Sequence, residues 1–229
     1  MKKGFTLAEV LIALGIIGVV AAVTLPGLNV NVQKSQVGPA LMKAINVLQN
    51  ANKLLLHDNN ARTLTAACNG AAYTQCVANF VGGVPINIPN NSYKFFDYSD
   101  ANINNSVRAS GSSSVNAIVT KDGMNYIWLT TIRRGPRRVG QPQRIITTEM
   151  MYVDINGVNK SPNIIGRDTF RIEVESDGTV FPFGGREYAD INGGDVLWET
   201  QCNNNVTPTN GMACAGSIVD NGGKVIYPW

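Results

Sequence analysis

The chain has 229 residues, of which 44% are hydrophobic and 15% are charged, and its formal net charge is +3. So small an excess of positive charge argues against nucleic acid as the main partner. His57 is the only histidine, and neither a Gly-rich phosphate loop nor a paired-acid motif is present. The usual catalytic arrangements therefore lack their residues, and we expect a protein that is not an enzyme.

An apolar stretch of 21 residues runs from Phe5 to Leu25 and contains a single charge, that of Glu9. About 20 helical residues cross the hydrocarbon core of a bilayer, so this stretch is long enough to span one. Lys2 and Lys3 precede it and predict a cytoplasmic N-terminus, with the bulk of the chain on the other side. A carboxylate within a membrane segment costs about 2.5–3.5 kcal/mol, so Glu9 predicts a function and needs a cationic partner.

The residues from Lys2 to Pro26, which begin Lys-Lys-Gly-Phe-Thr-Leu-Ala-Glu, resemble the N-terminal segment of type IV pilins and type II secretion pseudopilins. The resemblance implies that a prepilin peptidase cuts after Gly4 and methylates the new N-terminal Phe5. It also implies that Glu9 then pairs with the freed amine of a neighbouring subunit, which sets the register of assembly. Glu9 and Pro26 are the implied assembly residues.

The same resemblance implies a location and a set of partners. The chain would be a single-pass protein of the bacterial inner membrane, with its head in the periplasm or outside, and would later enter a filament. Its partners would be other copies or other pilins, the prepilin peptidase and an inner-membrane assembly platform. Residues 1–4 would form the leader, 5–25 the transmembrane and assembly helix, 26–57 its amphipathic continuation and 58–229 the β-rich head.

Two other interpretations of the apolar stretch remain open. A secretory signal could be cut near residues 21–23, and a plain membrane anchor would need no cut at all. A plain anchor, however, has no use for Glu9. Pro26 also has two interpretations, because it could mark the membrane boundary or, as in similar chains, the place where the helix kinks or melts during assembly.

Beyond Pro26 an amphipathic pattern continues the helix. Val37, Leu41, Ile45 and Leu48 recur at helical spacing, and Leu55 extends the same stripe. We expect one helix from about Thr6 to His57, whose second half packs on the head.

After residue 58, β-branched and aromatic runs alternate with turn residues, which predicts an antiparallel sheet. Asp122-Gly123 and Asp177-Gly178 are typical of hairpin turns. The expected fold class is therefore α+β, a long N-terminal helix packed on an antiparallel sheet, as the resemblance also implies. The expected strands are Ala117–Thr120, Asn125–Thr131, Arg144–Val153, Thr169–Glu175 and Thr179–Phe183.

The four cysteines, Cys68, Cys76, Cys202 and Cys214, allow three disulfide pairings in an exported chain. The pairs Cys68–Cys76 and Cys202–Cys214 close the shortest loops, and we favour them.

The segment from Asp154 to Asp168 is rich in oxygen donors, which hard cations prefer. Some pseudopilins bind calcium in the head, and here Asp154, Asn156 and Asp168 are the candidate ligands. The spacing is not that of an EF-hand. The alternative is a turn in which Asp and Asn side chains cap their own backbone, with no cofactor at all.

Five arginines fall within residues 133–144, between two expected strands. Arg133, Arg134, Arg137 and Arg138 would then lie on an exposed hairpin loop. Such a loop could contact a nucleic acid, contact an acidic patch on a neighbouring subunit, or simply be solvated.

Among the remaining acids and aromatics, Glu173 and Glu175 fit an exposed strand edge better than a glycosidase pair. Trp128, Trp198 and Trp229 are expected in the core or an interface rather than as platforms for sugars. Two functions compete: a structural subunit of a type IV pilus or pseudopilus, and a minor tip pilin whose head binds DNA, a surface or an exoprotein.

Overall fold

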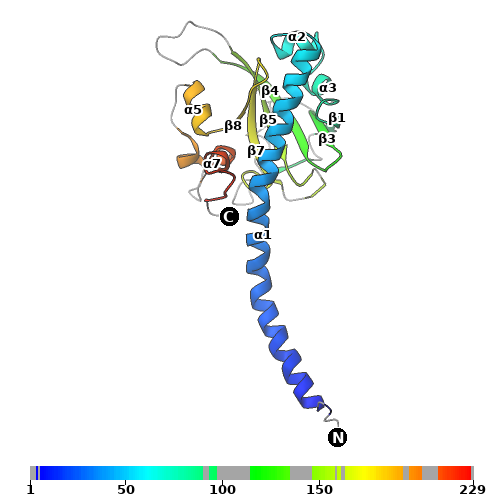
Figure 1. Cartoon of the computed structure of the whole chain (residues 1–229), viewed down its shortest axis with the longest axis vertical. Helices are drawn as coiled ribbons and strands as arrows, with labels where there is room; N and C mark the ends of the chain where they lie inside the picture. The colour runs from blue at the N-terminus through cyan, green and yellow to red at the C-terminus, as the bar shows by residue number, and fades with distance from the viewer. Residues whose placement is uncertain are drawn as a thin grey trace. The chain divides into compact units, whose positions relative to one another are not determined.

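The computed structural model describes residues 4, 6–89, 93–96, 114–134, 146–157, 159–160, 163–192, 196–202 and 211–227. The chain forms two compact units, Met1–Gln36 and Val37–Trp229. Helix α1, Leu7–Asp58, supplies the first unit and contributes its second half to the head (Figure 1). The expected helix from Thr6 to His57 is therefore confirmed to within one residue at each end.

The head contains a six-stranded antiparallel sheet in the order β1-β3-β4-β5-β7-β8. A second, two-stranded sheet pairs β2 with β6 in parallel. The strands of the large sheet are β1 Gly83–Pro89, β3 Ser114–Thr120, β4 Asn125–Arg134, β5 Ile146–Asp154, β7 Thr169–Glu175 and β8 Val180–Pro182. The small sheet consists of β2 Phe95–Phe96 and β6 Asn163–Ile164. The α+β, pilin-like architecture is confirmed, because a long N-terminal helix precedes a mostly antiparallel sheet.

Short helices complete the described part of the head: α2 Leu64–Cys68, α3 Tyr73–Val77, α5 Arg186–Asn192, α6 Trp198–Gln201 and α7 Cys214–Asp220. All five expected strands are present. Both Asp-Gly turns are also found where the hairpins turn, with positive φ angles of 87° at Gly123 and 88° at Gly178. Glycine adopts such angles without steric cost, so these turns follow directly from the sequence.

The second half of α1 packs on one face of the sheet through a stripe of apolar side chains. Leu48 is completely buried, and the Tyr126 hydroxyl on β4 donates a hydrogen bond of 2.9 Å to the carbonyl oxygen of Ala44. The stripe comprises Val37, Leu41, Ala44, Leu48, Ala51 and Leu55. The expected stripe is thus confirmed, with Ile45 partly buried at its margin.

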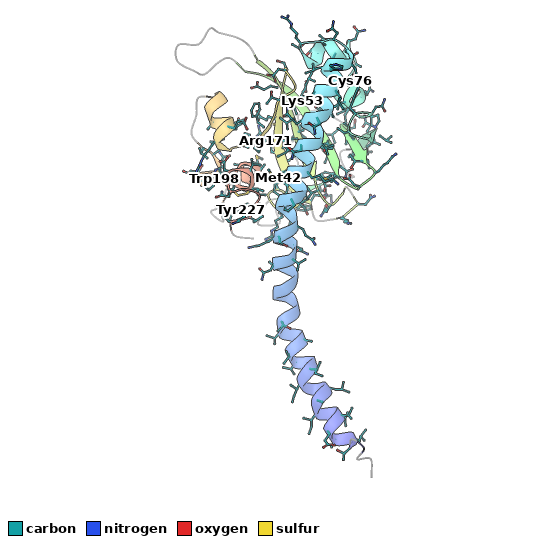
Figure 2. All side chains as sticks on the ribbon, in the orientation of Figure 1. Met42, Lys53, Cys76, Arg171, Trp198 and Tyr227 are labelled. Atoms are coloured by element: carbon teal, nitrogen blue, oxygen red, sulfur yellow. A yellow bond between two sulfur atoms is a disulfide. The ribbon has the colours of Figure 1, made fainter. Side chains whose placement is uncertain are left out.

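The other face of the sheet is covered by a second cluster that includes Tyr152, Phe95, Phe183 and Tyr188. A third cluster joins the start of this half of α1 to α7 and the C-terminal residues, where the hydroxyl of Tyr227, labelled in Figure 2, donates to the carbonyl oxygen of Gly166 at 2.6 Å.

Glu173 corrects one expectation. It does not lie on an exposed edge, because β7 pairs with β5 on one side and with β8 on the other. Its side chain is 2% exposed, and Nη2 of Arg171 donates to its Oε1 at 2.7 Å. The Arg171 guanidinium also lies 3.7 Å from the centre of the Phe183 ring. The pair therefore belongs to the packing of the head.

Candidate functional site

The start of α1 is closed by a reciprocal pair of hydrogen bonds between Thr6 and Glu9. The backbone N–H and the hydroxyl of Thr6 both donate to Oε2 of Glu9 at 2.8 Å, and the backbone N–H of Glu9 donates to the Thr6 hydroxyl at 3.3 Å. This arrangement is a capping box, which satisfies backbone donors that the first helical turn leaves free. The sequence Thr-Leu-Ala-Glu has the residue types and the spacing of a capping box. Thr6 is therefore a functional candidate that the sequence pattern could have revealed, although it was not predicted above.

The predicted cleavage point lies just before this cap. Gly4 is exposed, and apart from its chain neighbours no atom of the described residues lies within 4 Å of the position where a β-carbon would stand. A peptidase could therefore approach Gly4 closely. Phe5, Lys2 and Lys3 lie outside the described residues.

The helix that follows the cap is apolar on every side. The stretch Leu7–Thr24 has a mean hydropathy of 2.4 and none of it is buried, so it is long and apolar enough to cross a membrane. The large apolar side chains of this stretch that are more than half exposed are Leu7, Leu11, Ile12, Leu14, Ile16, Ile17, Val19, Val20 and Val23. Figure 2 shows that side chains project from both sides of this part of α1. A continuous surface of this kind requires lipid or other apolar helices around it.

Thr24 and Pro26 do not interrupt α1. The Thr24 hydroxyl donates to the carbonyl oxygen of Val20 at 2.9 Å, so this group needs no water. The helix continues through Pro26, which therefore does not end it. A role for Pro26 in assembly stays a prediction.

In the head, the structure brings together the three residues expected to bind calcium. Asp154 ends β5, and its Oδ1 accepts the backbone N–H groups of Asn156 at 3.1 Å and Gly157 at 2.8 Å. The side-chain amide of Asn156 donates to Oδ2 of Asp168 at 3.3 Å. Oδ1 of Asp168 in turn accepts the backbone N–H of Ile164 at 2.6 Å. The two Asp side chains thus accept backbone N–H groups within this turn.

These two carboxyl groups lie in an environment that disfavours negative charge. Burial, and after it the neighbouring charge of Asp154, raises the pKa of Asp168 to about 7. Asp154 is completely buried, and burial raises its pKa too, although hydrogen bonds from Gly157, Tyr93 and Asn156 oppose the shift. A cation beside this pair would remove the repulsion between the two groups.

Unpaired amide oxygens surround the same turn. The Oδ1 atoms of Asn125, Asn156 and Asn163 are buried and have no hydrogen-bond partner among the residues that the structure describes. Asn125 is the cross-strand partner of Asp154, and its side-chain nitrogen lies 3.6 Å from the position of a β-carbon built on Gly157. Asn163 precedes Ile164, whose N–H binds Asp168. Buried acceptors without donors are costly, and the amide oxygen is a ligand that calcium accepts.

The donor set therefore suits a hard cation, provided that amide oxygens complete it. Across the described residues, no group of three or more His, Cys, Asp or Glu side chains could hold a metal by itself. Asn163 lies within the Asp154–Asp168 segment, whereas Asn125 lies on β4, so the spacing of the segment could not reveal Asn125.

Both expected disulfides form. Cys68–Cys76 joins α2 to α3, and Cys202–Cys214 joins the residue after α6 to the first residue of α7. Trp198, which begins α6, donates its indole N–H to Oδ2 of Asp220 at 2.8 Å. Trp229 lies outside the described residues.

The arginine-rich segment needs a correction. Arg133 and Arg134 do not lie on a loop, because β4 extends through both and pairs them with Thr147 and Ile146 of β5. Backbone pairing with β5 therefore extends β4 to Arg134. Arg137 and Arg138 lie outside the described residues.

Comparison with known families finds one match. Residues 1–25 match the model of the prokaryotic N-terminal methylation motif. Comparisons with curated proteins and with solved structures found no match. The matched motif is the signature of the prepilin-type segments of type IV pilins and pseudopilins, and this chain combines that signature with a pilin-like α+β fold.

Proposed function

We propose that this chain is the precursor of a filament subunit, in a type IV pilus or a type II secretion pseudopilus, and acts structurally rather than as an enzyme. The observation that supports this best is the first half of α1, where a surface that is apolar on all sides contains one carboxylate, Glu9, within the matched methylation motif. A lipid anchor needs the apolar surface but not the carboxylate.

The proposed assembly step uses Gly4, Phe5 and Glu9. A prepilin peptidase cuts after Gly4 and leaves an ammonium group on Phe5. Oε2 of Glu9 accepts from Thr6, and the remaining oxygen accepts from the Phe5 ammonium of a neighbouring subunit. Because a charge in a medium of low dielectric needs a counter-charge, neutralisation fixes how far one helix is shifted along the next.

Mass spectrometry of the N-terminus tests the processing step, with protein from native membranes that contain or lack the prepilin peptidase. We expect a chain that begins with N-methylated Phe5 only where the enzyme is present. A chain that still begins at Met1, or one cut after Ala22, would contradict the proposal.

A Glu9→Val variant tests the assembly step separately. We expect it to be cut and methylated like the wild type but to be lost from sheared filaments. A variant that assembles normally would show that the carboxylate does not set the register.

The location and partners follow from the same proposal. The subunit waits in the bacterial inner membrane as a single-pass protein with its head in the periplasm. An inner-membrane assembly platform then extracts it into a filament of identical or related subunits.

A second candidate is a minor tip pilin whose head binds DNA, a surface or an exoprotein. The five arginines within residues 133–144 favour it, because clustered arginines attract phosphates and acidic patches. Reversing the charges of Arg133, Arg134, Arg137 and Arg138 separates the two candidates. Filaments that persist without uptake or adhesion would support the tip function, whereas filaments that fail would assign these arginines to subunit contacts.

We also propose that the turn containing Asp154, Asn156 and Asp168 binds calcium. The two adjacent carboxylates and the buried amide oxygens support this, and thermal unfolding of the wild type and of Asp168→Asn in EDTA and in calcium tests it.

A further inference from the structure

The contacts of α1 with two hairpin turns define the two ends of the head. Nζ of Lys43 lies 2.7 Å from Oδ2 of Asp122, in the turn between β3 and β4. Further along the helix, the side-chain amide of Asn52 donates to the carbonyl oxygen of Gly178, in the turn between β7 and β8, at 2.9 Å. These two turns lie at opposite ends of the antiparallel sheet. Helix α1 therefore enters the head at the end that contains the β3–β4 turn.

Two further segments lie at this entry end. A β-carbon built on Gly157 would lie 2.7 Å from the carbonyl oxygen of Gly123, so the turn after β5 packs against the β3–β4 turn. A β-carbon built on Gly38 would clash with the carbonyl oxygen of Gly223, so the segment after α7 touches the beginning of the head's part of α1. Three turns from distant parts of the chain thus share one surface with α1.

Lysines gather on this surface, which we call the basic end. The backbone N–H of Lys160 donates to the carbonyl oxygen of Gly157 at 2.9 Å, which places Lys160 in the turn after β5. The carbonyl oxygen of Lys94 accepts from the side-chain amide of Asn163, at the far side of that turn, at 3.4 Å. The exposed lysines of the basic end are Lys43, Lys94, Lys121, Lys160 and Lys224.

The acids of the basic end leave most of this positive charge without a direct counter-charge. Asp122 pairs with Lys43. Asp154 is completely buried, and Asp168 accepts the backbone N–H of Ile164 within the turn. Among the residues that the structure describes, the other four lysines of the basic end form no ion pair. The basic end is therefore a positive surface of the head.

An exposed apolar side chain adjoins these lysines. Ile226 is 55% exposed and follows Lys224 closely in the chain. The next residue is fixed to the head, because the Tyr227 hydroxyl donates to the carbonyl oxygen of Gly166 at 2.6 Å. Lysines that surround an apolar side chain are typical of surfaces that contact the interface of an anionic bilayer.

The chain that precedes the head favours a bilayer over other anionic partners. The candidate membrane span ends at Thr24, and the helical residues 25–36 separate it from Val37. As a helix these residues extend about 18 Å, of which the lipid headgroups occupy about 5–7 Å. The remaining distance is close to the Debye length of about 8–10 Å, and tilting of the helix shortens it. A tethered surface also has a high effective concentration, which a free nucleic acid lacks.

We propose that the basic end docks on the anionic phospholipid surface of the membrane that holds α1. This inference rests on the membrane anchoring of the proposed function. Each lysine held near such a surface strengthens association about fivefold. The head of the waiting precursor then lies against the bilayer, and extraction into a filament has to release it.

The test uses the full chain in nanodiscs of phosphatidylcholine, with and without about 30% phosphatidylglycerol, in buffer free of divalent cations. Neither lipid carries a primary amine, so an acetylating reagent reports the accessibility of each lysine, which peptide mass spectrometry quantifies. Lys53, labelled in Figure 2, is the internal control, because it is exposed on α1 beyond the basic end. A third sample contains neutral nanodiscs with double-stranded DNA at the same phosphate concentration.

In anionic nanodiscs we expect Lys94, Lys121, Lys160 and Lys224 to react about threefold or more slowly than in neutral ones. Lys53 should react at the same rate in both. Salt at about 0.5 M shortens the Debye length to about 4 Å and should remove the difference. DNA should protect the basic end less than the anionic bilayer does.

Charge reversal shows whether the basic end itself is responsible. Lys121→Glu combined with Lys224→Glu should abolish the protection of Lys94 and Lys160. The matched control, Lys53→Glu combined with Arg62→Glu, changes the net charge equally at exposed positions outside the basic end and should leave the protection intact. Thermal unfolding of each variant shows that the head has kept its fold, which substitutions at exposed positions should not disturb.

Four results would overturn the proposal. They are equal rates in neutral and anionic nanodiscs, equal protection of Lys53, protection that survives the Lys121→Glu and Lys224→Glu reversal, and protection by DNA as strong as that by the anionic bilayer. Size-exclusion chromatography separates this failure from that of the anchor. A chain that stays with the nanodiscs without protection contradicts the docking alone, whereas a chain that does not stay with them contradicts the anchoring as well.

Discussion

The two compact units place the same kinds of side chain in opposite surroundings. In Met1–Gln36 the large apolar side chains that the structure describes on α1 are exposed, whereas in the head Leu41, Leu48 and Leu55 of the same helix are at most 2% exposed. One helix therefore has one half that its own chain covers and one half that it leaves uncovered. The uncovered half needs partners from outside the chain, and the covered half needs none.

The acidic side chains also differ between the two units. Glu9 lies on the exposed half of α1 and is held by Thr6 of its own first turn. Asp168 lies in the head beside Asp154, where burial and repulsion act together. The exposed carboxylate of Glu9 is part of the helix cap and remains accessible to a partner from another chain. The buried pair of carboxyl groups in the head, by contrast, destabilises the folded state when both are charged. The four predictions below test each side of this comparison.

The largest expected effect comes from the apolar stripe. Leu48→Ala should lower the free energy of unfolding of the head by about 2–5 kcal/mol, because it opens a cavity at a completely buried position. Leu14→Ala is the matched control on the uncovered half, where the side chain is 60% exposed, and should change it by less than about 0.5 kcal/mol. Urea unfolding of the full chain in detergent measures both, and equal effects would break the comparison.

The second effect depends on pH and on Asp168. Since its pKa is about 7 in the folded chain and ordinary in the unfolded chain, the folded state keeps a proton that the unfolded state releases. Without divalent cations, stability should therefore fall as the pH rises from about 4 to about 7, by up to a few kcal/mol. Asp168→Asn removes the contribution of Asp168 to this dependence, so above pH 7 the variant should be the more stable protein.

Calcium should make the wild type more stable than Asp168→Asn, which is the opposite of the order expected in its absence. At pH 8, millimolar calcium should raise the unfolding midpoint of the wild type but leave that of Asp168→Asn unchanged, because the variant lacks one of the paired carboxylates. Thermal unfolding in EDTA and in calcium measures both effects. Wild-type stability that rises between pH 5 and pH 8 in EDTA would contradict the burial argument, and equal calcium shifts would contradict the calcium site.

The sequence predicts those elements in which a local pattern coincides with burial. The stripe of α1 and the Asp122-Gly123 hairpin are of this kind, since their spacing and turn chemistry are local. Strand β1 escaped prediction because Pro85 and Pro89 interrupt its pattern. It pairs only with β3, and an edge strand tolerates proline because one side needs no ladder bonds.

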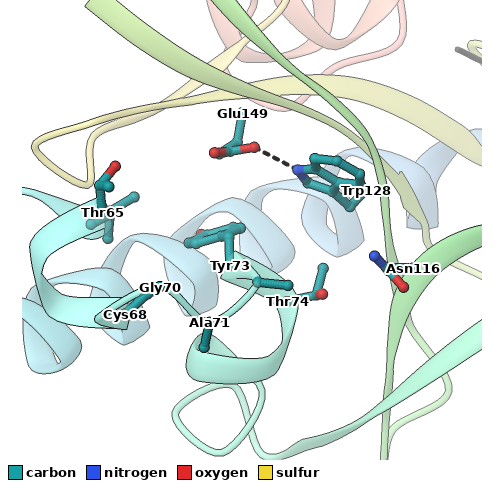
Figure 3. Close-up of a pocket in the computed structure, with 11 residues that line it drawn as sticks. Thr65, Cys68, Gly70, Ala71, Tyr73, Thr74, Asn116, Trp128 and Glu149 are labelled. Carbon is teal, nitrogen blue, oxygen red and sulfur yellow. Dashed lines mark hydrogen bonds between the residues drawn. The ribbon is translucent and has the colours of Figure 1, made fainter.

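Features that depend on distant contacts could not be predicted. Helix α7 is short, and Gly216 lets it approach the backbone so closely that a β-carbon there would lie 2.1 Å from the nitrogen of Gly185. A pocket of about 460 Å³ in the head, drawn in Figure 3, likewise combines Trp128, Glu149 and Asn116 with two helices tied by a disulfide. Only the topology of the sheet places these residues together.

The smallest expected effect comes from the cap of α1. It shows whether the cap stabilises only the uncovered half of the helix. Thr6→Val removes the hydroxyl that donates to Glu9 and accepts its backbone N–H, whereas Thr6→Ser keeps both bonds. The Glu9 amide should exchange its hydrogen about three- to tenfold faster in Thr6→Val, measured by NMR in micelles, and at the wild-type rate in Thr6→Ser. Neither variant should move the unfolding midpoint of the head. A shift of that midpoint would mean that the cap and the head are coupled through α1. The proposed cut leaves Thr6 as the second residue of the mature chain, so the cap survives processing and continues to hold one oxygen of Glu9 while the other remains for a neighbouring ammonium group.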